Sequence, residues 1–361
     1  MAQIRLENIS KKFGRQTALA DLNLDIADGE FFVLLGPTGA GKTTTLRLIA
    51  GLDAPNAGTI SINGENVNEH SAAERDVALV FQYYSLYPHY TVRENLEFPL
   101  RSKVRRLTEQ DISESVARAA KTLRIEHLLE RKTDKLSGGE MQRVSIGRAI
   151  VREPRVFLMD EPLSNLDAKL REVLRAELKD LQMKLGATFL YVTHDQVEAM
   201  SMGDKIGVLC DGRLVQVGSS QDIYSRPRDT FVATFVGSPA MNLFDATLGN
   251  GKAVVIPGSL EIPTDGEALG QLRDRAGKVR IGVRSEDILI DSSGPLEGTV
   301  HAVENHGVEK IVTLRVQDLL LRATVPARTV LELDSSIRFS FNDKKLHCFD
   351  SESGRNLVYG D

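Results

Sequence analysis

Residues 31–50, FFVLLGPTGAGKTTTLRLIA, decide the fold of this chain. The apolar run Phe31–Leu35 predicts a strand that is buried on both faces. A glycine-rich turn follows, and a helical pattern begins at Lys42 with Leu46 and Ile49 on one face. A strand, a glycine-rich turn and a helix are the context in which GxxxxGK[ST] forms a phosphate-binding loop. The stretch therefore predicts a binding site for a nucleoside triphosphate.

The predicted loop holds phosphate through its backbone before any side chain contributes. Glycines let the N–H groups converge, and the helix start adds unpaired N–H donors with a partial positive charge. Lys42 is expected to reach the β- and γ-phosphates, and the Thr43 hydroxyl is expected to ligate Mg²⁺. The expected nucleotide contacts of this loop are Gly36, Pro37, Thr38, Gly39, Ala40, Gly41, Lys42, Thr43 and Thr44.

Composition limits the classes of function. The chain has 361 residues, enough for two domains, and its 42% apolar and 26% charged content is ordinary for a globular protein. A net charge of −5 argues against an electrostatic nucleic-acid binder. Cys210 and Cys348 are its only cysteines, which fits a reducing cytoplasm. We expect no secretory signal, because the N-terminus has no apolar h-region, and no membrane span, because no apolar run approaches about 18 residues.

Two further strands are predicted to bring acid–base groups to the edge of the sheet where the phosphate loop lies. Residues 155–161, RVFLMDE, form a buried strand that ends in Asp160 and Glu161. Ligands of open α/β sheets bind at the carboxyl ends of the strands. Asp160 is expected to hold Mg²⁺, and Glu161 to polarise an attacking water. The strand at 188–192 leads to His194, which points at the same edge, although a strand-end histidine is most often structural.

The sequence LSGGEMQR at 136–143 precedes another predicted helix. Ser137 before two glycines and a helix start predicts a second anion site of the same physical kind. Ser137 with Glu140 also fits a capping box, in which the two side chains satisfy each other's backbone N–H groups. The two interpretations are compatible.

The rest of this domain is predicted to mix strands and helices. Residues 3–8 and 18–26 alternate apolar and polar side chains, as half-buried antiparallel strands do. Residues 92–130 are mostly helical and charged in pattern. A later helix ends at Gly186 and carries an apolar stripe made of Leu166, Leu170, Val173, Leu174, Leu178 and Leu181.

Aromatic residues at two places have open interpretations. Phe13 in the polar turn KKFGRQ is either packed on its own loop or a ring on which adenine stacks. Four of the seven tyrosines lie within eight residues, namely Tyr83, Tyr84, Tyr87 and Tyr90. They form either a local aromatic core or a protein–protein interface, where tyrosine is enriched.

Together these motifs resemble the nucleotide-binding subunit of an ABC transporter, over residues 1 to about 236. The matching segments are Gly36–Thr43 (Walker A), Gln82 (Q-loop), Leu136–Glu140 (signature), Val156–Asp160 with Glu161 (Walker B and catalytic glutamate), Ser164–Asp167 (D-loop) and His194 (switch histidine). The resemblance implies an α/β fold, with a RecA-like core and a helical subdomain at about 85–155. It also implies that Phe13 stacks on adenine, that Gln82 contacts ATP and Mg²⁺, and that His194 contacts the γ-phosphate.

The resemblance explains why one chain carries two anion sites. In the family, two subunits form a head-to-tail dimer, and the signature of one closes on the γ-phosphate held by the other. The residues expected to act in trans are Ser137, Gly138, Gly139, Glu140 and Asp167. The second subunit is either an identical chain or a closely related one. Glu140 departs from the commonest signature, which has Gln there, so its carboxylate must turn away or cap the helix through Ser137.

Residues 237–361 change to short alternating segments at all-β spacing. The pieces IYSRP, FVGSPAMN, IGVRSEDI and KKLHCFD resemble carbohydrate-importer ATPases of the maltose, trehalose or glycerol-phosphate type. This resemblance implies a small OB-like regulatory barrel and ATP-driven import of a sugar, polyol or related derivative. A plain interaction domain on an ABC ATPase of any cargo is the alternative.

The importer resemblance also implies partners and a place in the cell. Two transmembrane permease subunits would dock in the Q-loop cleft, and a periplasmic or lipid-anchored solute-binding protein would act indirectly. No nucleic acid is expected, and the chain would lie peripherally on the cytoplasmic face of the bacterial inner membrane. Three alternative functions compete with the importer ATPase. They are a soluble ABC ATPase acting on DNA or ribosomes, a regulatory module with little turnover, and an exporter subunit. The sequence does not identify the transported solute.

Overall fold

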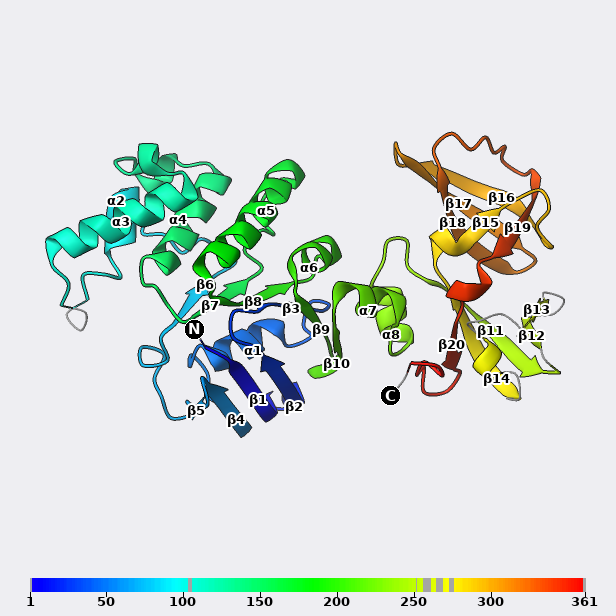
Figure 1. Cartoon of the computed structure of the whole chain (residues 1–361), viewed down its shortest axis with the longest axis horizontal. Coiled ribbons are helices and arrows are strands. Elements are labelled where there is room, and N and C mark those ends of the chain that lie inside the picture. The colour runs from blue at the N-terminus through cyan, green and yellow to red at the C-terminus, as the bar shows by residue number, and fades with distance from the viewer. Residues whose placement is uncertain are drawn as a thin grey trace. The chain divides into compact units, whose positions relative to one another are not determined.

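The computed structural model describes residues 2–102, 106–250, 252–255, 261–263, 269–272 and 276–359. The chain forms two compact units, Met1–Ser220 and Gln221–Asp361 (Figure 1). The compact units divide after Ser220. The domain boundary predicted from the sequence, between residues 236 and 237, stays a prediction. Among the described residues, no helix has the length and hydrophobicity that crossing a bilayer requires.

The first unit is built on a six-stranded sheet with the order β10-β9-β3-β8-β7-β6. Its strands run parallel from β6 to β9, and only β10 pairs antiparallel. Every residue of β3 and β8 is buried, which is why both strands are continuously apolar rather than alternating. The strands are β3 (Phe31–Leu35), β6 (Val77–Val80), β7 (Val156–Asp160), β8 (Thr188–Thr193), β9 (Lys205–Cys210) and β10 (Arg213–Gly218).

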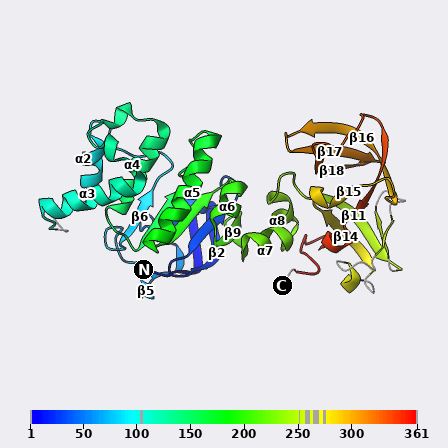
Figure 2. The ribbon, with the colours of Figure 1, turned by 45° about the horizontal axis from the view of Figure 1, so that its top comes forward.

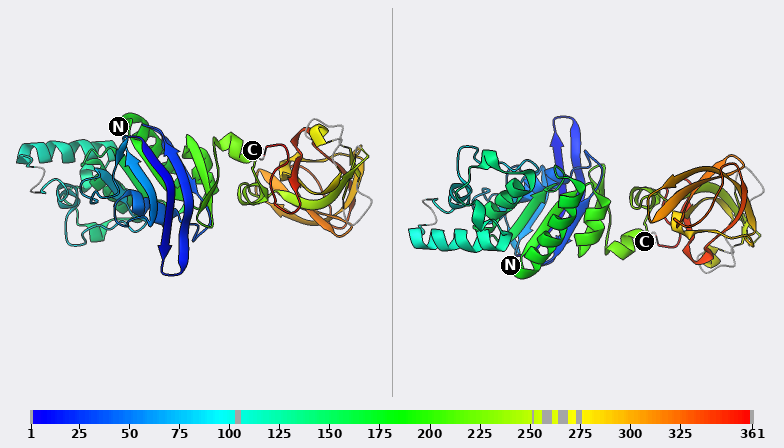
Figure 3. Two further views of the ribbon diagram at one scale, coloured as in Figure 1. Left: turned by 90° about the horizontal axis from the view of Figure 1, so that it is seen from below. Right: turned by 90° about the horizontal axis from the view of Figure 1, so that it is seen from above.

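A second, antiparallel sheet has the order β2-β1-β4-β5. Helix α1 (Lys42–Ile49) lies between the two sheets (Figures 1 and 3). Its Leu46 and Ile49 share one buried core with Leu22 of β2 and Leu34 of β3, so the helix after the phosphate loop is fixed from both sides. The strands are β1 (Ile4–Phe13), β2 (Gln16–Ile26), β4 (Ala57–Ile62) and β5 (Glu65–Asn66).

Helices complete the first unit in two groups. Helices α5 and α6 cover the face of the six-stranded sheet opposite α1 (Figure 2). Helices α2, α3 and α4 pack on one another and form the helical subdomain. The bounds are α2 (Val92–Glu97), α3 (Glu109–Leu123), α4 (Gly138–Ile150), α5 (Ala168–Leu185) and α6 (Gln196–Met202), with 3-10 turns η1 (Glu126–Leu128) and η2 (Thr133–Lys135).

The second unit begins with two short helices, α7 (Ser220–Ser225) and α8 (Thr230–Phe235), and continues as β structure. Its two five-stranded sheets, β13-β12-β11-β14-β20 and β15-β19-β16-β17-β18, enclose one core that includes Ile281, Val300 and Phe339 (Figure 3). The strands are β11 (Asn242–Gly249), β12 (Lys252–Val255), β13 (Glu261–Pro263), β14 (Gly277–Val283), β15 (Ile288–Ile290), β16 (Leu296–Asn305), β17 (Glu309–Val316), β18 (Leu319–Pro326), β19 (Ser336–Phe341) and β20 (His347–Asp350).

The 3-10 turns of this unit are η3 (Gly270–Leu272), η4 (Ser285–Asp287) and η5 (Asp343–Lys345). The predicted fold class, an α/β phosphate-loop unit followed by a small all-β barrel, is confirmed.

Candidate nucleotide-binding and catalytic site

Three parallel strands end at one edge of the six-stranded sheet. In the strand register, Leu35 of β3 pairs with Thr193 of β8, and Asp160 of β7 pairs with Val192 of β8. The phosphate loop follows β3, Glu161 follows β7 and His194 follows β8, so all three lie at neighbouring points of this edge. Three separate segments of the chain supply one site because a parallel sheet aligns the carboxyl ends of its strands.

The phosphate loop has the backbone that its glycines predict. Gly39 and Gly41 have positive φ angles of 84° and 105°, which only glycine adopts without strain. A Cβ at Gly36 would lie 2.3 Å from the Leu209 carbonyl oxygen, so β9 leaves no room for a side chain there. Gly41 caps α1 without a side-chain hydrogen bond, and the first turn of the helix contains no acidic residue. The N–H donors at the start of α1 thus face no competing carboxylate of their own helix.

Lys42 is folded onto this loop and reaches across to the carboxylate at the end of β7. Its ammonium donates to the carbonyl oxygens of Gly36 at 2.8 Å and Pro37 at 3.0 Å, and lies 3.6 Å from Glu161 Oε1. Burial lowers the pKa of Lys42, and the neighbouring charge of Glu161 partly opposes that shift. Lys42 therefore joins the loop to the proposed catalytic carboxylate.

Glu161 and His194 contact each other directly. The distance from His194 Nδ1 to Glu161 Oε2 is 2.8 Å. Glu161 has a φ of 45°, which is unusual for a residue with a side chain, and its N–H donates to the Val192 carbonyl at 3.0 Å. This backbone turn aims the carboxylate between Lys42 and His194, so both of its oxygens have a cationic or imidazole neighbour.

Thr43 and Asp160 form a second contact between the loop and β7. Thr43 Oγ1 donates to Asp160 Oδ1 at 3.0 Å. Burial raises the pKa of Asp160, and the Thr43 hydrogen bond partly opposes that shift. A hydroxyl and a carboxylate oxygen side by side are hard donors of the kind that Mg²⁺ takes in nucleotide sites.

Gln82 reaches the site through the segment that follows Glu161. Its Nε2 donates to Ser164 Oγ at 3.3 Å, and Ser164 Oγ donates to the Glu161 carbonyl at 2.9 Å. The Gln82 carbonyl accepts from Asn165 Nδ2 at 2.9 Å. Among the described residues, Gln82 thus hydrogen-bonds to the D-loop and not to Thr43 or Asp160. The sequence indicates the D-loop Ser164–Asp167, but it does not predict the contacts of Ser164 and Asn165 with Gln82.

Ser137 and Glu140 form the predicted capping box at the start of α4. Glu140 Oε2 accepts from the Ser137 N–H at 2.7 Å and from Ser137 Oγ at 2.8 Å. Glu140 Oε1 lies 3.5 Å from Arg131 Nη1. The Ser137 backbone hydrogen bond lowers the pKa of Glu140. The prediction that this carboxylate caps the helix is confirmed, and Asp167 likewise caps α5 by accepting from the Leu170 N–H at 3.0 Å.

Phe13 and three of the four clustered tyrosines are exposed, and Tyr84 is partly buried. Phe13 ends β1 with half of its surface exposed, and Lys11 Nζ lies 4.9 Å from its ring centre. Tyr87, Tyr90 and Phe98 form a cluster with ring centres 4.4–6.4 Å apart, and each of the three is at least 37% exposed. This cluster is therefore neither a buried core nor a set of isolated side chains. It is a packed aromatic surface next to the Q-loop.

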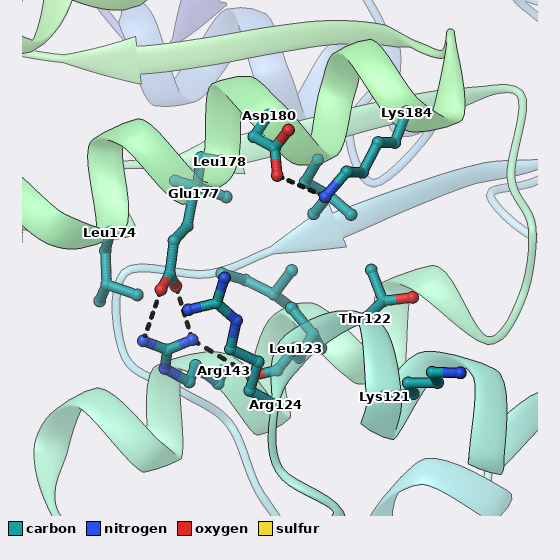
Figure 4. A pocket seen from close by; sticks show the side chains of 12 residues that line it. Lys121, Thr122, Leu123, Arg124, Arg143, Leu174, Glu177, Leu178, Asp180 and Lys184 are labelled. Carbon is teal, nitrogen blue, oxygen red and sulfur yellow. Dashed lines mark hydrogen bonds and ion pairs between the residues drawn. The ribbon is translucent and has the colours of Figure 1, made fainter.

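A cavity of about 320 Å³ opens elsewhere, between α3, α4 and α5 (Figure 4). It is lined by Arg143 and Glu177, which form a salt bridge with a 3.0 Å hydrogen bond, and by leucines such as Leu174. None of its lining residues belongs to the phosphate loop, to β7 or to the loop of His194. It is a space between the helical subdomain and α5, separate from the proposed chemistry.

A phosphate loop, a strand-end carboxylate pair, a strand-end histidine and a glycine-rich helix start on this fold define an ATP-binding cassette. The ABC transporter family matches residues 19–164, and the MalK OB fold domain matches residues 237–288. A trehalose/maltose import ATP-binding protein of Thermococcus litoralis is 45% identical, over 99% of this chain and 100% of its own length. A glycerol-3-phosphate import ATP-binding protein of Ruegeria pomeroyi is 44% identical with the same coverage.

Solved structures agree with this class. A dimeric ATP-binding cassette in a post-hydrolysis state with ADP and phosphate is 33% identical, with a TM-score of 0.54 over 60% of this chain and 98% of that chain. A nucleotide-free cassette from an ABC transporter is 28% identical, with a TM-score of 0.55 over 61% of this chain and 92% of that chain. The chain belongs to the ATP-binding subunits of ABC importers that carry a MalK-type OB fold domain. It is thus a nucleotide-binding ATPase of that family.

Proposed function

We propose that this chain hydrolyses ATP to power import of a sugar, polyol or related carbohydrate derivative. The observation that carries the proposal is the contact of Glu161 with both Lys42 and His194 at the mouth of the phosphate loop. The cargo class is supported by full-length similarity to trehalose/maltose, glycerol-3-phosphate and xylose/arabinose import ATP-binding proteins.

The proposed mechanism relies on positioning and charge. The loop N–H groups and Lys42 hold the β- and γ-phosphates, where Lys42 exchanges its carbonyl contacts for phosphate oxygens. Glu161 orients and polarises the attacking water. His194 contacts the γ-phosphate and stabilises the charge that develops there. The 2.8 Å contact between Glu161 and His194 supports these two roles, because it lets both side chains face the same phosphate.

Thr43 and Asp160 would hold Mg²⁺, with Gln82 as a further oxygen donor. The 3.0 Å hydrogen bond between Thr43 and Asp160 places two hard ligands together, which fits the usual combination of one or two protein oxygens with substrate phosphates. When bound, the ion neutralises charge on the β- and γ-phosphates. Gln82 contacts the D-loop, which follows Asp160 and Glu161 in the chain, through Ser164. Phe13 would stack on the adenine, since its ring is half exposed and already faces a cation.

The second anion site acts in trans in this proposal. Ser137, Gly138, Gly139 and Glu140 at the start of α4, with Asp167 at the start of α5, would close on the γ-phosphate held by a second subunit. Glu140 is turned back onto Ser137, so its charge is engaged before any phosphate approaches. ATP then bridges two surfaces, and hydrolysis removes the bridge and releases the dimer.

The exposed aromatic cluster of Tyr87, Tyr90 and Phe98 would receive the membrane subunits. The proposal is supported by the position of the cluster in the segment that follows Gln82, because the family resemblance implies a permease contact in the Q-loop cleft. Two permease subunits would dock there, which would hold the chain on the cytoplasmic face of the bacterial inner membrane. A periplasmic or lipid-anchored solute-binding protein would act through those permeases.

The test of the proposal is Glu161→Gln in the full-length chain. Glutamine keeps the shape but cannot polarise water, so turnover is expected to fall by about 10²-fold or more. ATP binding is expected to persist, because the phosphate loop is unchanged. The variant should accumulate as an ATP-dependent dimer, measured by light scattering with and without ATP alongside phosphate release.

Ser137→Ala tests the trans assignment separately. It should reduce ATP-dependent dimerisation of the Glu161→Gln variant while leaving nucleotide binding by the monomer intact. Turnover like that of the wild type in Glu161→Gln would overturn the catalytic assignment. Full turnover by a strict monomer that lacks Ser137 would overturn the dimer mechanism.

A further inference from the structure

Arg171 on α5 contacts two loops that are distant in sequence. Its Nη2 donates to the carbonyl oxygens of Leu166 at 3.1 Å and Ser164 at 3.4 Å. Its Nη1 donates to Asp195 Oδ2 at 3.2 Å. One planar guanidinium therefore joins the D-loop to the residue that directly follows His194.

The first of these loops sets the backbone of Glu161. The Glu161 carbonyl accepts from the Ser164 N–H at 3.2 Å and from Ser164 Oγ at 2.9 Å. Glu161 itself has a positive φ, a conformation that persists only when its surroundings hold it. A shift of Ser164 would therefore be passed directly to the carboxylate that faces Lys42 and His194.

The second loop sets the position of His194. The Asp195 N–H donates to Thr193 Oγ1 at 2.9 Å, and Asp195 Oδ1 accepts from the N–H groups of Val197 at 2.8 Å and Glu198 at 3.1 Å. The residues on either side of His194 are thus hydrogen-bonded to each other and to the start of α6. The imidazole is the exposed member of a fixed turn, and Arg171 holds that turn through Asp195.

A buried carboxylate lies beside the third nitrogen of Arg171. Glu198 is only 2% exposed and accepts hydrogen bonds from Tyr191 at 2.9 Å and Thr193 at 2.7 Å. Its other oxygen lies 3.8 Å from Arg171 Nε, which is buried and makes no hydrogen bond. The guanidinium therefore balances Glu198 through charge while its two terminal nitrogens bind the loops.

We propose that Arg171 is a positioning residue that sets the Glu161–His194 pair by clamping the D-loop to the switch-histidine loop. The inference rests on the proposed function, in which Glu161 and His194 act on water and the γ-phosphate. Arg171 is on α5, and its hydrogen bonds in the described part of the chain go to neither the phosphate loop nor Lys42. Its loss should therefore reduce kcat without weakening ATP binding.

The experiment compares Arg171→Met and Arg171→Lys in the full-length chain. Arg171→Met should lower kcat about tenfold or more and change KM for ATP by less than about twofold. Arg171→Lys keeps the charge opposite Glu198 but cannot bridge both loops. Its kcat should therefore lie between that of the wild type and that of Arg171→Met. Steady-state ATPase rates are measured well below the midpoint of thermal unfolding, with circular dichroism to verify the folded fraction.

Lys179→Met is the matched control. Lys179 lies on the same helix and forms a 2.6 Å salt bridge with Asp204, so the variant also removes a cation of α5 from a carboxylate. Lys179 makes no hydrogen bond to either clamped loop in the described part of the chain. The kcat of Lys179→Met should therefore stay within about twofold of the wild type.

A double-mutant cycle with Asp195→Asn separates positioning from general stability. Asparagine still caps α6, but it weakens the charge-assisted bond to Arg171. The kcat of the double variant should match that of Arg171→Met, because both changes break the same bridge. Should Arg171→Met fail to fold, Arg171→Lys and Asp195→Asn carry the test, and each should still lower kcat at constant KM.

The inference is wrong if folded Arg171→Met or Arg171→Lys keeps the wild-type kcat, or if Lys179→Met loses as much. Failure of the proposed function looks different, because Glu161→Gln would then turn over normally whatever Arg171 does. If Glu161→Gln is inactive and Arg171→Met is fully active, the proposed function stands and only the proposed role of Arg171 is wrong.

Discussion

Glu140 shows at the residue scale how local geometry resolves a conflict in the sequence. A carboxylate in a predicted phosphate-binding segment is unfavourable if it faces the phosphate. The structure turns it onto the Ser137 N–H and hydroxyl and toward Arg131. The charge therefore stabilises the start of α4, where the helix dipole favours an anion. Sequence reasoning could predict this orientation because a capping box depends only on residues three positions apart.

Glu140→Gln should leave activity almost unchanged and alter the pH dependence of stability. Glutamine also completes a capping box, so turnover should stay within about twofold of the wild type. At pH 7 the wild type should be more stable by about 0.3–1 kcal/mol, because only the carboxylate carries charge at the helix N-terminus. The measurement is thermal unfolding of both proteins from pH 7 to pH 3.

The sign of this dependence follows from the lowered pKa of Glu140 in the folded state. A carboxyl with a lowered folded pKa contributes its stability above its unfolded value of about 4.3. That contribution is lost as the pH falls through the folded pKa. The advantage over Glu140→Gln should therefore shrink below about pH 4. An advantage that is constant across this range would contradict the assignment.

At the scale of elements, the phosphate loop depends on how closely β9 approaches it. The glycines at 39 and 41 are needed for backbone conformation, but Gly36 is needed for space. A motif match identifies all three without separating these reasons. The distance from Gly36 to the Leu209 carbonyl comes from the pairing of β3 with β9, two strands that are 170 residues apart in sequence.

Gly36→Ala should destabilise the first unit and weaken ATP binding together. Its Cβ would lie 2.3 Å from a backbone oxygen, which cannot rotate away as a side chain could. We expect a loss of about 1–3 kcal/mol in the free energy of unfolding, measured by urea titration, and reduced binding of a fluorescent ATP analogue. Gly249→Ala is the control, because a Cβ there meets nothing within 4 Å, and it should cost less than about 0.5 kcal/mol. Equal losses in both variants would contradict the steric explanation.

The helix α5 shows where periodicity succeeds and where it fails. Leu174, Leu178 and Leu181 are buried as the apolar stripe predicts, and Gly186 ends the helix in a left-handed conformation. Val173 was placed on the same stripe, but it is 46% exposed. A helical period predicts a face but not its width, because the width depends on what packs against it.

At the scale of the whole molecule, the chain contains separate cores for its two units. The core of the first unit joins both of its sheets around α1, and the core of the second joins two five-stranded sheets. Asn242 links those five-stranded sheets. Its Oδ1 accepts from the Arg322 N–H at 2.7 Å, and its Nδ2 donates to the Arg322 carbonyl at 2.9 Å and the Val283 carbonyl at 3.2 Å.

Asn242→Ala should destabilise the second unit without changing nucleotide affinity. It leaves buried backbone groups without partners, which costs about 1–3 kcal/mol. Calorimetry should show a lowered transition for the barrel, while ATP binding to the first unit stays as in the wild type. Leu320→Ala on β18 removes a side chain that is 56% exposed and should have little effect on either measurement. A fall in ATP affinity in Asn242→Ala would contradict the independence of the two units.

The amino-acid sequence alone predicts the phosphate loop, the strand-end carboxylates, the capping box of Ser137 with Glu140, and the all-β character of the second unit. These features depend on residues that are near each other in the chain, where spacing dictates geometry. Three contacts could be found only from the folded structure, namely Glu161 between Lys42 and His194, Gln82 beside Ser164, and Arg171 between two loops. Those contacts depend on the register of parallel strands and the placement of α5, and long-range packing sets both.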